Sequence, residues 1–100
     1  MKKLISVVLS TAIVFLPLAA QAGEVYNRIQ RQDRRIDSGL QNGTLTHQQA
    51  NRLERRVNRI NAQRVRDLQQ NGGRLTHSEY NNLNRRLNNT SRSIYYDKHH

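Results

Sequence analysis

The sequence predicts an all-α protein with an up-down-up arrangement of three helices, built from two overlapping helical hairpins. One motif occurs twice, as NGTLTHQQANRLERRV at residues 42–57 and as NGGRLTHSEYNNLNRRL at residues 71–87. Each copy contains a helix-stop signal followed by a helix-start signal, with apolar residues at helical spacing on both sides. Because short loops between helices favour antiparallel neighbours, the middle helix should be shared by both hairpins.

The first helix is expected at about residues 24–41. An apolar residue recurs there at steps that keep one helical face. Asn42-Gly43 follows, and both residue types readily adopt the left-handed conformation that ends a helix. The apolar residues of this face are Val25, Ile29, Ile36 and Leu40.

The second helix is expected at about residues 47–70. The Thr46 hydroxyl can accept the amide of Gln49, whose side chain can reach back to the amide of Thr46, which makes a capping box. The apolar face then continues to a stop signal at Asn71-Gly72-Gly73. That face comprises Leu53, Val57, Ile60, Val65 and Leu68.

The third helix is expected at about residues 77–94. Thr76 and Glu79 repeat the capping box, and Leu75 with Tyr80 forms a hydrophobic staple around it. Residues 97–100 are expected to form a flexible tail, so the helical domain should span residues 23–96. The apolar face consists of Tyr80, Leu83, Leu87 and Ile94.

The N-terminal residues 1–22 have the pattern of a signal peptide. Met1-Lys2-Lys3 is a positive start, an apolar stretch follows, and Ala20-Gln21-Ala22 fits a cleavage site. Cleavage after Ala22 would leave a periplasmic or secreted protein that does not span a membrane. The sequence contains no cysteine, so no disulfide supports this small domain.

The predicted mature chain is strongly basic. It carries 15 basic and 7 acidic residues, a formal charge of +8 (15 − 7), and all but one of the basic residues are arginine. Arginine binds phosphate and carboxylate groups bidentately, which predicts an anionic envelope component or a protein client as partner. The alternative is that these arginines only form a solvated helical face. The candidate partner-binding residues are the paired arginines Arg34, Arg35, Arg55, Arg56, Arg85 and Arg86.

The sequence offers little for other chemistries. It has no cysteine nucleophile, no serine in a glycine elbow and only scattered acidic residues, so we expect no enzyme. Aromatic residues for base stacking are sparse, so we expect no specific nucleic acid. The loop before each capping box lacks the carboxylates of a calcium site.

Metal binding by histidine is the alternative to anion binding. In an up-down-up arrangement His47, His99 and His100 should lie at one end of the molecule and can hold Zn²⁺ or Cu²⁺, whereas His77 should lie at the other end. Apart from this alternative, we expect no cofactor.

Two resemblances bear on these expectations. The signal peptide, the repeated G-x-L-T-x-x-E/Q hairpin and the tail S-R-x-I-Y-x-x-K-H resemble small exported proteobacterial helical proteins of undescribed function. In addition, residues 45–49 read LTHQQ and are similar to the L-T-x-x-Q signature of Spy/CpxP-type periplasmic stress proteins, which are basic, helical and dimeric. The second copy departs from that signature, because Glu79 replaces the glutamine.

The leading hypothesis is therefore a non-enzymatic periplasmic or secreted protein that binds an anionic or unfolded partner in envelope stress, either alone or as a homodimer. A metal-responsive periplasmic protein and a secreted inhibitor or effector that docks on one protein are the alternatives.

Overall fold

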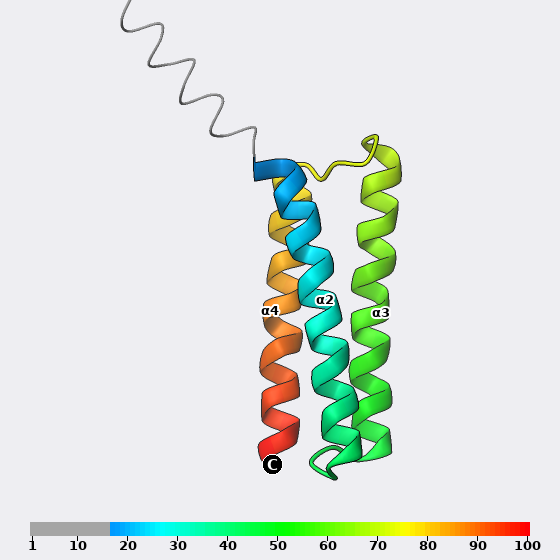
Figure 1. The fold of residues 1–100 in the computed structure, drawn as a ribbon, viewed down its shortest axis with the longest axis vertical. Helices are drawn as coiled ribbons and strands as arrows, with labels where there is room; N and C mark the ends of the chain where they lie inside the picture. The colour runs from blue at the N-terminus through cyan, green and yellow to red at the C-terminus, as the bar shows by residue number, and fades with distance from the viewer. Residues whose placement is uncertain (1–16) are drawn as a thin grey trace, which may run out of the picture.

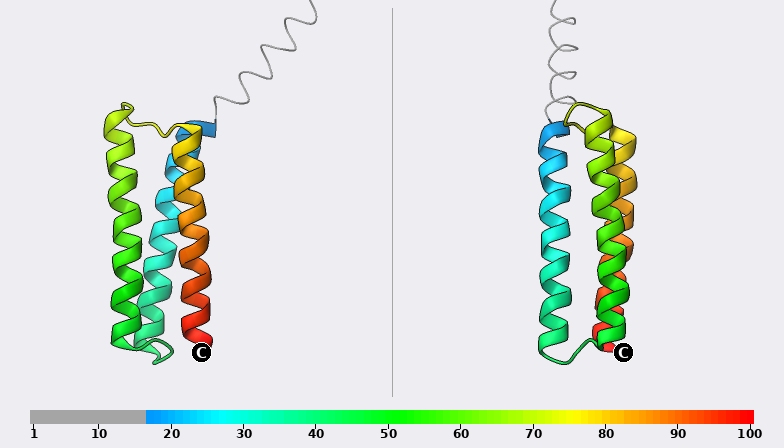
Figure 2. Two further views of the ribbon diagram at one scale, coloured as in Figure 1. Left: turned by 180° about the vertical axis from the view of Figure 1, so that it is seen from behind. Right: turned by 90° about the vertical axis from the view of Figure 1, so that its right-hand side faces the viewer.

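Three long α-helices lie side by side and form a bundle (Figure 1). The computed structural model describes residues 17–100. The helices are α2 (Pro17–Gln41), α3 (His47–Gln70) and α4 (His77–His99), and each packs against both of the others. The α2–α3 loop and the C-terminus lie at one end, and the α3–α4 loop lies at the other (Figures 1 and 2). The predicted all-α, three-helix, up-down-up fold is confirmed.

The outer ends of the bundle differ from the expected bounds. Helix α2 begins at Pro17, before the expected start at Glu24, and thus includes the end of the predicted signal peptide. The rest of that prediction concerns residues 1–16, which lie outside the described residues. Within residues 17–100, no helix is both long and apolar enough to cross a membrane.

Helix α4 continues to His99, so residues 97–99 are helical and do not form the expected tail. Side chains of the last turn support this extension. The His99 ring stacks on Tyr95 with centroids 4.0 Å apart, and His99 Nδ1 lies 2.7 Å from the Tyr95 carbonyl oxygen. His100 repeats the arrangement on Tyr96 at 3.9 Å and 2.9 Å. These contacts hold both rings against the C-terminal end of α4.

Both predicted capping boxes are present. The Gln49 amide donates to Thr46 Oγ1 at 3.0 Å, and the Thr46 amide donates to Gln49 Oε1 at 2.9 Å. At the start of α4, the corresponding distances between Thr76 and Glu79 are 3.1 Å and 2.8 Å. The hydrogen bond from the Thr76 amide is the main cause that lowers the pKa of Glu79. The ionised Glu79 side chain therefore stabilises the fold at pH values above its unfolded pKa, and this stabilisation is lost as the pH falls through its folded pKa.

Replacement of Thr76 by alanine should lower the free energy of unfolding by about 1 kcal/mol, because the first turn of α4 loses a side-chain acceptor. Urea unfolding followed by circular dichroism would measure the change. Thr76→Ser is the control and should retain most of the stability. Unchanged stability in a Thr46→Ala, Thr76→Ala double variant would contradict the role of both boxes.

Loop geometry ties the first hairpin closely together. The Leu45 amide donates to the Gly39 carbonyl oxygen at 3.0 Å, which folds the loop back over the last turn of α2. A Cβ atom on Gly39 would lie 2.7 Å from Leu45 Cγ and 2.8 Å from Lys98 Cε of α4. Only a residue without a side chain allows this approach, so Gly39 lets the loop and the end of α4 meet.

The core is a single apolar cluster that runs the length of the bundle. Leu45 and Leu75, the residues before the two capping boxes, both join it, and Tyr80 packs against it as the predicted staple requires. Val65 was predicted to belong to this core, but it is 38% exposed, and Asp67 is buried in its place at 4% exposed. The step from Ile60 to Val65 turns the helix away from the core face, whereas a step of seven keeps it. The buried apolar residues are Val25, Ile29, Ile36, Leu45, Ala50, Leu53, Val57, Ile60, Leu75, Leu83, Leu87 and Ile94.

A row of hydrogen bonds, here called the α2–α4 seam, accompanies the apolar contacts between these two helices. Gln32 is its buried member at 3% exposed. Gln32 Nε2 donates to the Leu87 carbonyl oxygen at 2.8 Å, while Gln32 Oε1 is buried without a hydrogen-bond partner. The donors of the seam are Arg28, Gln32 and Arg35 of α2, and the acceptors on α4 are Asn84, Leu87, Asn88 and Ser91.

Candidate anion-binding groove

The three arginine pairs share one pattern of exposure. Each pair directly precedes a buried core residue, namely Ile36, Val57 and Leu87. Successive helical residues point about 100° apart, so the second arginine of each pair lies beside the core and the first faces solvent. The exposed members are Arg34, Arg55 and Arg85, and the half-buried members are Arg35, Arg56 and Arg86.

Arg35 belongs to the α2–α4 seam. Its Nη1 donates to Ser91 Oγ at 2.7 Å and its Nη2 to the Ser91 carbonyl oxygen at 3.2 Å. Burial lowers the pKa of Arg35 from its ordinary value. Burial, followed by the charge of Arg35, also lowers the pKa of Lys98. Arg35 therefore connects two helices, and its guanidinium is already engaged.

Arg56 and Arg86 instead meet across the interface between α3 and α4. Two adjoining hollows lie there and share Arg56 and Asn89. We call them together the arginine groove. The smaller hollow has a volume of about 110 Å³ and is lined by Arg56, Arg59, Ile60, Arg86, Asn89 and Thr90. The larger has a volume of about 450 Å³ and is lined by Arg56, Asn89, Arg92, Ser93, Tyr96 and Asp97.

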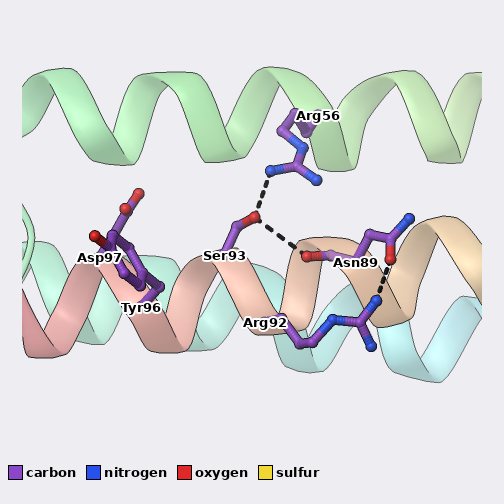
Figure 3. A pocket seen from close by; sticks show the side chains of 6 residues that line it. All are labelled: Arg56, Asn89, Arg92, Ser93, Tyr96 and Asp97. Carbon is purple, nitrogen blue, oxygen red and sulfur yellow. Dashed lines mark hydrogen bonds between the residues drawn. The ribbon is translucent and has the colours of Figure 1, made fainter.

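Neutral polar groups of α4 orient two of these arginines (Figure 3). Arg56 Nη1 donates across the interface to Ser93 Oγ at 2.7 Å, and Ser93 Oγ donates to the Asn89 carbonyl oxygen at 3.2 Å. Arg92 Nη2 donates to Asn89 Oδ1. Because neutral acceptors hold both guanidiniums, these bonds leave the positive charges uncompensated.

The lining of the groove is asymmetric in charge. Four arginines line it, and Asp97 is its one carboxylate among the described residues. Asp97 lines only the larger hollow, at the C-terminal end of α4. The smaller hollow is thus lined by three arginines and no acidic residue within residues 17–100. Guanidinium groups in this setting can bind a phosphate or carboxylate bidentately.

A further hollow lies between α3 and the start of α4 and has a different character. Its lining includes Asp67 and Glu79, together with Arg85. Asp67 accepts a hydrogen bond from Gln63 at 2.8 Å, and Glu79 accepts one from Asn71 at 2.7 Å in addition to its capping bonds. The Glu79 carboxylate thus holds Asn71 of the α3–α4 loop, the Asp67 carboxylate holds Gln63 within α3, and the two together make this hollow unsuitable for an anion.

The histidines do not form the predicted metal site. Within residues 17–100, no three or more His, Cys, Asp or Glu side chains are grouped so that they can hold a metal ion. His47 is exposed at the start of α3, and His99 and His100 each stack on the tyrosine one turn earlier. The structure therefore does not bring His47, His99 and His100 together as ligands of one ion.

The sequence interpretation missed several residues of the groove: Arg59, Asn89, Arg92, Ser93 and Tyr96. The helical spacing of these residues in the sequence does indicate that they share helix faces. Ser93 and Asp97 follow Asn89 by four and eight residues, and Arg59 follows Arg56 by three, so each set shares a helical face. The pairing of these faces becomes visible only when α3 and α4 are placed side by side.

Comparisons with models of protein families, with curated proteins and with solved structures find no match for this chain. The two resemblances drawn from sequence motifs are therefore untested predictions. The arginine groove itself is the basis for a functional proposal.

Proposed function

We propose that the protein is a non-enzymatic binder of an anionic partner and that the arginine groove is its binding site. The observation that supports this proposal is the meeting of Arg56, Arg59 and Arg86 in one hollow whose lining has no carboxylate among the described residues. Partial enclosure between two helices reduces the screening that makes exposed charges ineffective. The predicted export would place the partner in the periplasm or outside the cell, in keeping with a role in envelope stress.

The six paired arginines are not equivalent in this proposal. Arg56 and Arg86 line the groove, Arg35 is engaged in the α2–α4 seam, and the exposed members face solvent. Binding should therefore depend on where a charge lies as well as on how many charges there are. This distinguishes a binding site from a solvated basic face, for which only the total charge matters.

A charge-matched pair of variants tests the proposal. Arg59→Gln with Arg86→Gln removes two charges from the groove, whereas Arg55→Gln with Arg85→Gln removes two charges from the same helices at positions that line neither of its hollows. Calorimetric titration with short-chain polyphosphate should show affinity reduced at least about fivefold in the groove variant and less than about twofold in the other.

Two further measurements complete this test. The affinity of the unsubstituted protein for polyphosphate should fall as salt rises, because neutralised charges release counterions. Circular dichroism should show equal helicity in both variants, since glutamine keeps the helix propensity of arginine. Equal losses of affinity in the two variants would contradict a site and would favour a solvated face.

A further inference from the structure

We propose that the arginine groove takes a phosphorylated carbohydrate, with the phosphate in the smaller hollow and a sugar ring in the larger one. This inference rests on the proposed anion binding and adds the chemical class of the ligand. It follows from the sizes of the two hollows, from the residues that line each of them and from their spacing along α4.

The smaller hollow suits a single phosphate group. Its volume of about 110 Å³ is well below that of a complete small-molecule site, which is typically about 300–1,000 Å³. Arg56 and Arg59 of α3 and Arg86 of α4 line it, so arginines of both helices surround the space. Several forked donors around one small space match the three oxygens of a phosphate monoester better than the two of a carboxylate.

The larger hollow suits a hydroxyl-bearing group. Its volume of about 450 Å³ lies within the usual range of small-molecule sites. The Asp97 carboxylate can accept hydrogen bonds from hydroxyl groups, and Arg92 can donate to them. Asn89 and Ser93 add amide and hydroxyl groups, and the exposed ring of Tyr96 offers an apolar surface. A sugar ring presents hydroxyl groups and an apolar C–H face to such a lining.

The spacing of the hollows agrees with a phosphate attached directly to a ring. The residues that line only the smaller hollow include Thr90, and those that line only the larger include Ser93, about one helical turn farther along α4, and Tyr96, nearly two turns farther. One turn rises about 5 Å. A nucleotide fits less well, because Tyr96 is the one aromatic residue in the described lining of the larger hollow.

Titration calorimetry with glucose 1-phosphate, inorganic phosphate and adenosine monophosphate tests this inference on the unsubstituted protein. Glucose 1-phosphate should bind at least about tenfold more tightly than inorganic phosphate and more tightly than the nucleotide. Tyr96→Ala and Asp97→Ala should each weaken glucose 1-phosphate binding at least about threefold without changing phosphate binding. Tyr95→Ala removes a neighbouring tyrosine of similar exposure outside the groove and should change neither.

The outcomes separate this inference from the proposed function. If inorganic phosphate or the nucleotide binds as tightly as glucose 1-phosphate, or if Tyr96→Ala and Asp97→Ala have no effect, the carbohydrate inference is overturned even though polyphosphate still distinguishes the arginine variants. If the two double arginine variants have the same affinity for polyphosphate, the groove is not an anion site and both proposals fail. Tighter binding of phosphorylated dextran than of glucose 1-phosphate would support the inference and identify a glycan as the source of the phosphate.

Discussion

Leu83→Ala should leave most of the protein unfolded at room temperature. Leu83 is completely buried in α4 and belongs to the apolar cluster that joins the three helices. Removal of such a side chain costs about 2–5 kcal/mol, because apolar contacts are lost and a cavity remains. The core of a domain of this size without disulfides rarely supplies more than about 3–5 kcal/mol of net stability. Loss of the helical circular dichroism signal and a shift of the urea midpoint would measure the effect.

The matched control for this prediction is Val65→Ala. Val65 lies on α3 and is 38% exposed, so its truncation creates no enclosed cavity. We expect a change below about 0.5 kcal/mol, as for most surface substitutions. If the two variants had similar stabilities, the burial of Leu83 in the core would be contradicted.

Gln32→Met should stabilise the protein by about 1 kcal/mol. The glutamine buries Oε1 without a partner, and an unsatisfied buried acceptor costs about 1–3 kcal/mol. The substitution also removes the donor to the Leu87 carbonyl oxygen, a bond worth about 0.5–1.5 kcal/mol. That carbonyl remains within α4, where the helical hydrogen bond is still available to it. An apolar side chain of similar length should therefore give a net gain.

Thermal and urea unfolding of Gln32→Met would measure this gain, and Gln69→Met on the exposed surface of α3 is the control. The control should leave the melting temperature unchanged, because neither side chain is buried there. A lower melting temperature for Gln32→Met would contradict the prediction and would show that Gln32 contributes more through its hydrogen bond than its buried oxygen costs.

The fold was predictable because its signals are local. Each capping box lies within four consecutive residues and each stop signal within two or three, so the inner helix bounds at Gln41, His47, Gln70 and His77 agree with the expectation. The end of α4 was not predictable in the same way. Its last turn depends on stacking of His99 on Tyr95, which differs from the usual signals for a helix end.

The candidate site was only partly predictable, because periodicity shows which face of a helix is buried but not which neighbour covers it. The sequence offered three arginine pairs as equivalent candidates, two of them in the repeat and one in the first helix. The structure separates them, since Arg35 faces α4 across the seam while Arg56 faces α4 across the groove. Arg59 of α3 and Arg92 of α4 belong to no arginine pair. They are recognised as groove residues only because they line the hollows between the two helices. Such non-local information is absent from a single sequence.

The α2–α4 seam has a consequence for how uniquely the helices are aligned along their axes. Contacts among leucine, isoleucine and valine have no direction, so an apolar interface tolerates a helix that slides by one turn. The seam's bonds are directional and join residues 55 to 60 positions apart in the chain. A slide of one turn, about 5.4 Å, would break all of them together. The hydrogen bonds of the seam thus select one axial register of α2 on α4 from several that the core alone would accept.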